Sequence, residues 1–206
     1  MSPIILCLQE TKLDPSKKFY LKQFSSFRCD NLAVGNAKGG FLITVSKNVH
    51  SEEIPINSPF QAVAVKVMLD TTIKICSIYI NPSDNLTQSA LLDLLNQLPR
   101  PFILTGDFNA HNPLWVSIKL DNKGKEIESL LNLSDTILLN SGLPTRLDIY
   151  SGSFSSIDLS FCSSSLTPVL NWTMGPDLYS SDHFPQVIDI ITSSLSSRLG
   201  IFSENS

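Results

Sequence analysis

Residues 102–111 of this chain read Phe-Ile-Leu-Thr-Gly-Asp-Phe-Asn-Ala-His, and the interpretation of the whole sequence starts from them. The apolar start of the stretch predicts a buried strand that ends near Gly106. Asp107, Asn109 and His111 then place a carboxylate, an amide and an imidazole at the strand end, where α/β proteins usually bind their ligands. These groups can hold a hard cation, bind a phosphate and transfer a proton. The stretch therefore predicts a functional site at a sheet edge, with a plain Gly-Asp turn as the alternative.

The composition predicts one globular domain. The chain has 206 residues, 42% of them hydrophobic, which is enough for a sizeable core. Its net charge of −4 argues against a protein that binds polyanions over its whole surface. A local basic face can still contact phosphates, or it can simply be solvated surface. Two clusters could form such a face: Lys12, Lys17, Lys18, Lys22 and Arg28, and Lys119, Lys123 and Lys125.

The cysteines indicate a reducing compartment. Cys7, Cys76 and Cys162 lie in apolar runs, and no cysteine pair has CxxC or zinc-like spacing, so buried free thiols are expected. The apolar run at residues 4–8 is too short for the core of a signal peptide. No apolar run approaches the length that spans a membrane. We therefore expect a soluble intracellular protein with no membrane partner.

The apolar patterns predict an α/β domain over residues 1–192. One-sided apolar faces predict helices over 86–98 and 123–132, and a short helix is expected within 19–27. Residues 193–206 are serine-rich and are expected to be a tail or linker. Alternating or continuous apolar runs predict strands over 4–8, 41–45, 62–69, 73–79, 102–105, 137–140, 155–161 and 187–191.

Side chains with useful chemistry stand at the ends of several of these strands. Glu10 follows the first apolar run, Tyr79 ends a strand, and Asp182 and His183 precede the last strand. Asp158 lies between apolar neighbours, so it needs a partner if it is buried. Each of these residues alone is also compatible with a purely structural role.

As a set, these residues suit the hydrolysis of a phosphate ester. Carboxylates without a thiolate or a pair of histidines favour Mg²⁺ or Mn²⁺ over zinc. A hard cation can polarise a phosphoryl oxygen and stabilise charge on the leaving oxygen. The sequence has neither a glycine-rich phosphate loop with a trailing lysine nor a GxSxG elbow. These absences argue against P-loop nucleotide hydrolases and against hydrolases with that serine motif.

Four short runs resemble the endonuclease/exonuclease/phosphatase superfamily, both in sequence and in their order along the chain. The resemblance covers roughly residues 4–191 and implies a four-layer α/β sandwich. Its two mixed, largely antiparallel sheets would be flanked by helices, with a metal site at one edge. The runs are Gln9-Glu10-Thr11, Gly106–His111, Ser156–Leu159 and Ser181–Pro185.

A narrower resemblance points to the apurinic-type endonuclease domain of jockey-like non-LTR retrotransposon polyproteins. Asn109-Ala110-His111 followed by Trp115 is typical of that group, as is the run Leu143–Arg146. His111 and Thr145 fall where the group often has residues that contact the substrate.

The superfamily implies a role for each matching residue near the metal. Glu10 and Asp182 would bind the divalent cation, Mg²⁺ or Mn²⁺. Asp107 would orient or deprotonate the attacking water, and Asn109 would bond to the phosphate or to that water. Tyr79 would hold a phosphate oxygen.

The superfamily also implies a paired histidine and aspartate. His183 would contact the scissile phosphate and share in proton transfer, while Asp158 would fix its ring. An imidazole held by a carboxylate keeps one tautomer and has a raised pKa, which suits a cationic phosphate contact.

The resemblance implies a DNA endonuclease that nicks one strand of a target duplex and leaves a 3′-hydroxyl as the primer for reverse transcription. A reverse transcriptase normally follows in the same polyprotein but not in this sequence. We expect a monomer that needs access to the nucleus if it is active. Two alternatives stay open: a catalytically dead remnant that binds DNA at most weakly, and a phosphomonoesterase or phospholipase of the same superfamily.

Two departures from the family pattern bear on activity. Family members begin with a strand whose asparagine lies in the active site, whereas only three residues precede Ile4. The first family strand is therefore expected to be missing, which would expose neighbouring strand edges. Val116 follows Trp115 at a position where the group commonly has glycine.

Overall fold

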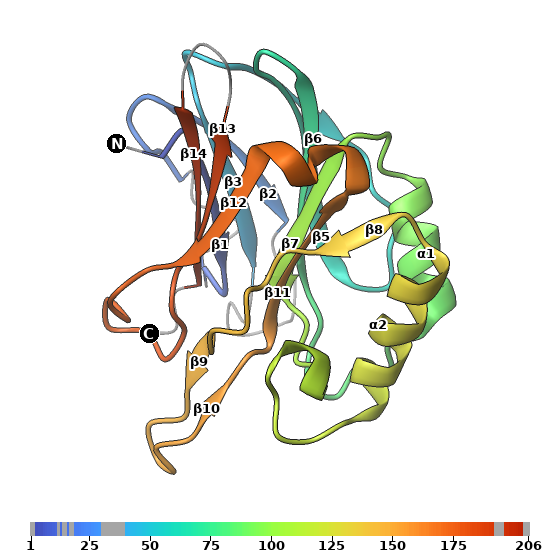
Figure 1. The fold of residues 1–206 in the computed structure, drawn as a ribbon. Coiled ribbons are helices and arrows are strands. Elements are labelled where there is room, and N and C mark those ends of the chain that lie inside the picture. Colours follow the sequence, from blue (N-terminus) through green and yellow to red (C-terminus); the bar gives the residue numbers. More distant parts are fainter. Residues whose placement is uncertain are drawn as a thin grey trace.

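Two six-stranded sheets pack face to face around a shared apolar core (Figure 1). The structure is a computed structural model that describes residues 3–11, 13, 16, 19–29, 40–191 and 196–203. Each sheet contains one parallel pair of strands among antiparallel ones. This sandwich of two mixed sheets confirms the fold class expected from the sequence.

The first sheet contains both the first and the last described strands of the chain. Its strand order is β12-β13-β14-β1-β3-β2, with β1 and β14 parallel. The strands are β1 (Ile5–Gln9), β2 (Phe24–Cys29), β3 (Phe41–Ser46), β12 (Leu170–Met174), β13 (Gln186–Ile191) and β14 (Ser196–Ser203).

The second sheet is built from the middle of the chain. Its order is β4-β5-β6-β7-β11-β8, with β6 and β7 parallel. A two-stranded hairpin extends from it, formed by β9 (Arg146–Leu147) and β10 (Phe154–Ser155). The sheet strands are β4 (His50–Ile54), β5 (Gln61–Met68), β6 (Thr72–Tyr79), β7 (Phe102–Asp107), β8 (Thr136–Leu138) and β11 (Asp158–Ser163).

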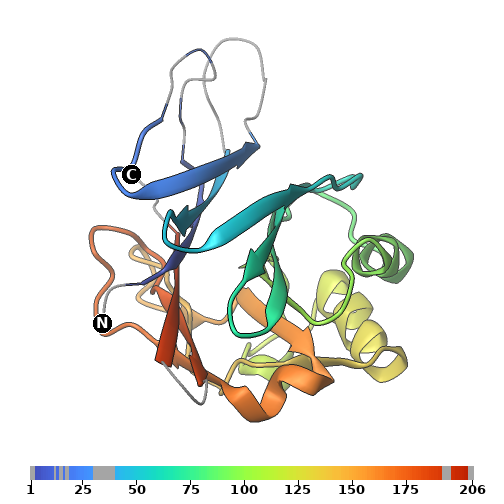
Figure 2. The ribbon, with the colours of Figure 1, turned by 90° about the horizontal axis from the view of Figure 1, so that it is seen from above.

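The two α-helices of the described residues lie on the outer face of the second sheet (Figure 2). The first begins after Thr87, whose hydroxyl accepts a hydrogen bond from the Ala90 N–H. The second begins after Asp121, whose carboxylate accepts one from the Gly124 N–H. Both residues are N-caps, which satisfy an otherwise unpaired donor. The helices are α1 (Gln88–Asn96) and α2 (Asn122–Leu133), with the 3₁₀ helices η1 (Pro113–Trp115) and η2 (Ser164–Val169).

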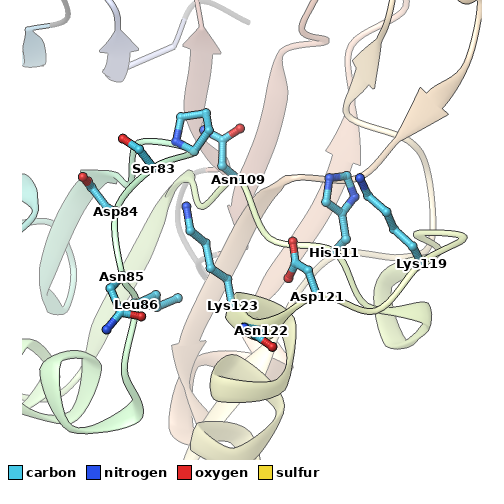
Figure 3. Close-up of a pocket in the computed structure, with 11 residues that line it drawn as sticks. Ser83, Asp84, Asn85, Leu86, Asn109, His111, Lys119, Asp121, Asn122 and Lys123 are labelled. Atoms are coloured by element: carbon cyan, nitrogen blue, oxygen red, sulfur yellow. The ribbon is translucent and has the colours of Figure 1, made fainter.

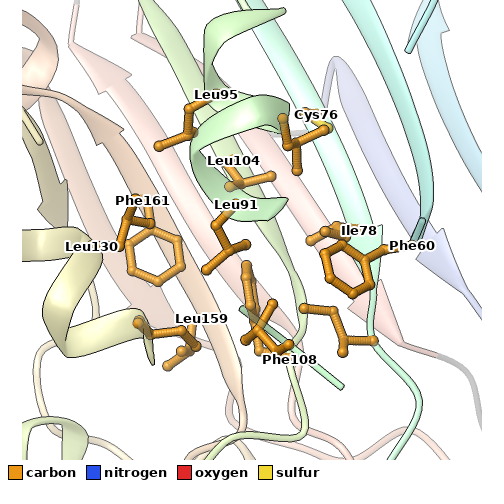
Figure 4. Packing of buried hydrophobic residues seen from close by; sticks show 14 of the residues in the cluster. Phe60, Cys76, Ile78, Leu91, Leu95, Leu104, Phe108, Leu130, Leu159 and Phe161 are labelled. Atoms are coloured by element: carbon orange, nitrogen blue, oxygen red, sulfur yellow. The ribbon is translucent and has the colours of Figure 1, made fainter. Parts of the chain in front are cut away.

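The second sheet separates two apolar clusters. On β7, Ile103 packs in the cluster between the sheets and Leu104 in the cluster under the helices, as alternation along a strand requires. In the outer cluster, Leu91 of α1 and Leu130 of α2 pack with Leu104 and Phe161 of the sheet (Figure 4). The sheet is therefore held on both faces, which fixes the positions of its strand ends.

Two expectations from the sequence are wrong. Residues 19–27 do not form a short helix, because Phe24–Cys29 forms β2 and pairs with β3. The serine-rich stretch is not only a tail, because Ser196–Ser203 forms β14 between β1 and β13. Backbone pairing with two neighbours satisfies the N–H and C=O groups of β1 and β13, whatever side chains the inserted strand carries.

The described residues show three layers of the expected four. Their α-helices cover the second sheet, and none lies on the outer face of the first. No helix in these ranges is long and apolar enough to cross a membrane.

Candidate active site

Three neighbouring strands of the second sheet bring their polar ends into one row. Asp107, the last residue of β7, lies opposite Tyr79 at the end of β6 and opposite Asp158 at the start of β11. Residues that face each other across strands project from the same side of a sheet. This is the inner side, because Tyr79 also packs in the cluster between the sheets. Strand register thus places two carboxylates and a phenol side by side.

Gly106 allows β7 to approach β6 closely at this edge. A Cβ atom on Gly106 would lie 1.8 Å from the carbonyl oxygen of Ile78 and 3.0 Å from Gln9 Nε2. Gln9 Nε2 donates a hydrogen bond to that carbonyl at 3.2 Å, so a side chain of the first sheet reaches the second at this point. The glycine before Asp107 is therefore required by close packing of the backbone.

A tight turn after β7 orients the Asp107 carboxylate. Asp107 Oδ1 accepts a hydrogen bond from the Asn109 backbone N–H at 2.9 Å, and Oδ2 accepts one from the Asn109 side-chain amide at 3.0 Å. The same amide donates to the Ile80 carbonyl at 3.1 Å. Asn109 has a φ of 45°, a left-handed conformation that asparagine adopts more readily than most residues. Asn109 therefore fixes the carboxylate from both sides.

Asp158 holds the His183 ring inside the site. His183 Nδ1 lies 2.8 Å from Asp158 Oδ2 and 3.0 Å from Oδ1, and both side chains are buried. Burial lowers the pKa of His183, but the charge of Asp158 and the hydrogen bond to it outweigh burial and raise the pKa to about 9. The imidazole is therefore a cation at neutral pH, with Nδ1 engaged by Asp158.

Thr145 holds the backbone segment that carries Asp158. Its side chain is fully buried, and its hydroxyl oxygen accepts hydrogen bonds from the backbone N–H groups of Ile157 at 3.2 Å and Asp158 at 3.0 Å. These bonds fix the start of β11. The structure thus gives the Thr145 hydroxyl a role in holding the backbone, while the substrate contact that the resemblance implies for this residue stays a prediction.

Burial and the closeness of several acidic groups shift the pKa values of the residues in this row. Burial raises the pKa of Asp107 to about 8, and the negative charge of Asp158 adds to this effect, while His183 opposes it. Burial also raises the pKa of Tyr79. The negative charge of Glu10 and a hydrogen bond between Tyr79 and Glu10 raise it further. Tyr79 therefore stays protonated, and Glu10 belongs to the same electrostatic group although it follows β1 on the other sheet.

One group of ligand atoms could hold a metal ion. Asp107, Asp158 and His183 each offer one such atom, and these atoms all lie within 4.8 Å of one another. Among the described residues, Glu10 and Asp182, the ligands that the resemblance implies, fall outside this group. The structure therefore concentrates possible ligands on the β7 and β11 side of the site.

The sequence analysis assigned no role to three residues that hydrogen-bond around the site. Gln9 links the sheets, and Arg146 Nε donates a hydrogen bond to Asp182 Oδ2 at 2.9 Å. Gln186 Oε1 accepts a hydrogen bond from Ser160 Oγ at 2.8 Å, inside the sandwich. Gln9 and Arg146 belong to the motif runs themselves and Gln186 directly follows the run Ser181–Pro185, which is the signal that could have found them.

His111 lies apart from the row. It lines a cavity of about 460 Å³ together with Asn109, Lys119 and Lys123 (Figure 3). Burial and the charge of Lys119 lower the pKa of His111, so this imidazole is neutral at neutral pH. Asn109 hydrogen-bonds to Asp107 and also lines this cavity, so the cavity adjoins the row of strand-end residues.

Comparison with known proteins gives a family match across the site. A model of the endonuclease-reverse transcriptase family matches residues 73–187, which is more than half of the chain. The matched range contains Tyr79, Asp107, Asp158 and His183.

Similar full-length proteins are much longer than this chain. The probable RNA-directed DNA polymerase from transposon X-element of Drosophila melanogaster is 28% identical over 196 residues, which make up 93% of this chain and 22% of the relative. The RNA-directed DNA polymerase from mobile element jockey of the same species is 23% identical over 145 residues, covering 68% of this chain and 16% of the relative. This chain therefore spans less than a quarter of the length of either relative.

A solved structure has the same fold. The endonuclease domain of TRAS1, a telomere-specific non-LTR retrotransposon, superposes with a TM-score of 0.68 at 24% sequence identity. The superposition covers 82% of this chain and 81% of the other.

Proposed function

Since this chain belongs to the endonuclease-reverse transcriptase family, we propose that it is a DNA endonuclease domain that nicks one strand of a duplex with the help of Mg²⁺ or Mn²⁺. The observation that carries the proposal is the buried group of Asp107, Asp158 and His183 at the end of the sandwich. It combines acidic oxygens, which hold a hard cation, with an imidazolium, which can contact a phosphate.

The residues at this edge fit a divalent cation. Asp107 and Asp158 are buried side by side with Glu10 close by, and this crowding of negative charge contributes to the raised pKa of Asp107. A nearby cation favours the ionised form of such carboxylates. We expect the oxygens of Asp107, Asp158 and Glu10 to provide the ligands, with Asp182 beside them. A bound cation would polarise the scissile phosphate and stabilise charge on the leaving oxygen.

Asp107 would accept the proton of the attacking water. Asn109 orients its carboxylate, and a bound cation would keep that carboxylate ionised and so able to accept a proton. The water oxygen forms the new bond to phosphorus, the bond from phosphorus to O3′ breaks, and O3′ takes up a proton, which the imidazolium of His183 can donate. The products are a 3′-hydroxyl and a 5′-phosphate.

His183 and Tyr79 would bind the phosphate while this happens. His183 is cationic with Nδ1 bonded to Asp158, so Nε2 is the nitrogen that can face the phosphate. Tyr79 keeps its proton because its pKa is raised, so its hydroxyl can donate to a phosphate oxygen. Both donors are fixed before substrate binds, which lowers the cost of reorganisation.

The relatives suggest the purpose of the nick. Both are named RNA-directed DNA polymerases, and this chain matches only part of each. We propose that the domain works when fused to a reverse transcriptase, which would extend the 3′-hydroxyl that the nick exposes.

Nicking of supercoiled plasmid tests the proposed activity. We expect the parent chain to nick in Mg²⁺ and not in EDTA. Asp107→Ala and His183→Ala should each lower the rate by at least about 100-fold, the usual contribution of a positioned acid or base. The matched control is Asp93→Ala, which removes an exposed carboxylate on α1 and should leave the rate unchanged.

Two outcomes would contradict the proposal. One is intact plasmid after incubation with parent protein that is folded by circular dichroism. The other is release of inorganic phosphate from phosphate monoesters without any nicking, which would identify a phosphomonoesterase of the same superfamily.

A further inference from the structure

A cavity of about 460 Å³ adjoins the catalytic row at Asn109 and has no part in the chemistry proposed above. Four segments line it: the loop after β6, the turn after β7, the loop before α2 and the start of α2. The side chain of Lys123 enters it from the first turn of α2, and Lys119, on the loop before α2, lies beside His111 (Figure 3).

The two lysines provide the positive charge of this cavity. Lys123 is largely buried, and its Nζ donates a hydrogen bond to the Asn81 carbonyl oxygen. Lys119 is exposed at the rim and close enough to His111 to lower its pKa. Neither lysine forms a salt bridge with a carboxylate in the part of the chain that the structure describes. The charges of Asp84, Asp121 and Asp107 act on Lys123 from a distance, but neither lysine has to break a direct ion pair to contact an anion.

The carboxylates of the cavity limit the charge of that anion. Asp84 Oδ2 accepts hydrogen bonds from the backbone N–H and the side chain of Asn81, and Asp121 Oδ1 accepts one from the Gly124 N–H. Both carboxylates are thus engaged in shaping the loop and capping α2. Their charge still opposes a dianion more than a monoanion. This balance favours a phosphodiester, which carries one charge, over a phosphate monoester.

We propose that this cavity binds a phosphodiester of the DNA strand next to the scissile phosphate, held by Lys119 and Lys123. The proposal rests on the nuclease function proposed above. Charges along one DNA strand recur about every 3.4 Å of the helix axis, so a strand whose phosphate lies over Asp107 presents further phosphates nearby. Asn109 borders both spaces and would position the two phosphates relative to each other.

Binding measured without cleavage tests this site separately from the chemistry. The probe is a fluorescent DNA duplex titrated with the full chain in EDTA at several salt concentrations. Lys119→Ala should reduce the slope of log affinity against log salt by about 0.9, the value for one lost phosphate contact. Lys119→Arg should restore the slope. Lys125→Ala is the matched control, because Lys125 is exposed on α2 and does not line the cavity.

A second measurement identifies the phosphate. Single methylphosphonate substitutions remove the charge of one phosphate at a time along the duplex. The parent should lose affinity at one position beside the cleaved bond, and Lys119→Ala should be insensitive at that same position. Lys123→Met should behave like Lys119→Ala if circular dichroism shows that it folds.

The outcomes separate the two proposals. Equal salt slopes for Lys119→Ala and Lys125→Ala, with nicking intact in the parent, would overturn the phosphate site and leave the nuclease function standing. A reduced slope for Lys119→Ala together with no nicking by the parent would support the site and contradict the catalytic proposal. An equal loss of affinity at every methylphosphonate position would also overturn the site. It would indicate that the protein attracts the DNA through its overall charge and not through one phosphate contact.

Discussion

The hydroxyl of Thr145 is expected to matter for both stability and activity. It satisfies two buried backbone N–H groups at the start of β11. Thr145→Val keeps the shape of the side chain but leaves both donors without a partner, so we expect a loss of about 1–3 kcal/mol in the free energy of unfolding. Nicking should also slow, because Asp158 loses its anchor. Urea denaturation and the plasmid assay measure the two effects.

A buried threonine on β8 of the second sheet provides the control. Thr136 is 3% exposed, and its hydroxyl has no hydrogen-bond partner among the described residues. Thr136→Val should therefore be neutral or stabilising. Equal losses for the two variants would mean that the Thr145 hydrogen bonds contribute nothing specific.

Asp107 and His183 should make the metal-free protein less stable as the pH rises. The folded pKa of His183 is about 9, against an ordinary value of 6.5. Its contribution to the free energy of unfolding is therefore complete below pH 6.5 and is lost as the pH passes 9. The folded pKa of Asp107 is about 8 against 3.8, and its contribution likewise falls as the pH rises towards 8. In EDTA, the urea midpoint should therefore fall between pH 6.5 and 9, and His183→Gln should flatten this fall.

Divalent metal should oppose the part of this effect that comes from Asp107. A cation stabilises the ionised carboxylate, so Mg²⁺ should raise the melting temperature more at pH 8 than at pH 6. Mg²⁺ would not bind at the Asp107 carboxylate if it raised the melting temperature equally at pH 8 and pH 6. The same conclusion would follow if Asp107→Ala showed the same rise as the parent.

At the scale of the strand, Gly106 sets how closely β7 can approach β6. An added Cβ would lie 1.8 Å from the Ile78 carbonyl oxygen, so one of the strands must shift. We expect Gly106→Ala to cost at least about 3 kcal/mol in stability and to abolish nicking. Gly152→Ala is the control: no atom lies within 4 Å of its added Cβ, and only its φ of 68° adds strain, so the loss should be about 1 kcal/mol. Similar losses for both would contradict the close approach.

Elements with a strong apolar pattern were predictable. The helices expected over 86–98 and 123–132 are α1 and α2, and the strand expected over 102–105 is β7, which continues to Asp107. β2 was missed because its residues are all only partly buried, so they lack the alternation that identifies a strand. β14 was missed because its pairing comes from the neighbouring β1 and β13, which no local pattern of serines can reveal.

The main residues of the candidate site were predictable from the sequence, but the hydrogen bonds that hold them in place were not. Strand-end positions identified Tyr79, Asp107 and Asp158, which strand register brings together. The link from Gln9 to the second sheet depends on how the two sheets pack, so sequence spacing gives no sign of it. Val116, noted as an unusual residue, has a φ of 68° and thus adopts a conformation that glycine adopts without strain.

At the scale of the whole molecule, β14 joins the two halves of the first sheet. It pairs with β1 on one side and β13 on the other. A chain ending at residue 192 would expose both strand edges, and exposed edges promote aggregation. We expect this truncated chain to unfold at lower urea and to sediment as aggregates, while the full chain stays monomeric. An unchanged midpoint and a monomeric truncated chain would show that this pairing contributes nothing.

The chemistry of the nicked ends tests the central proposal most directly. Supercoiled plasmid is incubated with the parent chain in Mg²⁺, and a DNA polymerase with labelled nucleotides is then added without phosphatase treatment. We expect labelled nicked circles, because cleavage leaves a 3′-hydroxyl that the polymerase extends, and no label with EDTA or Asp107→Ala. Folded parent protein that leaves the plasmid supercoiled, or nicks that the polymerase cannot extend, would contradict an endonuclease that primes reverse transcription.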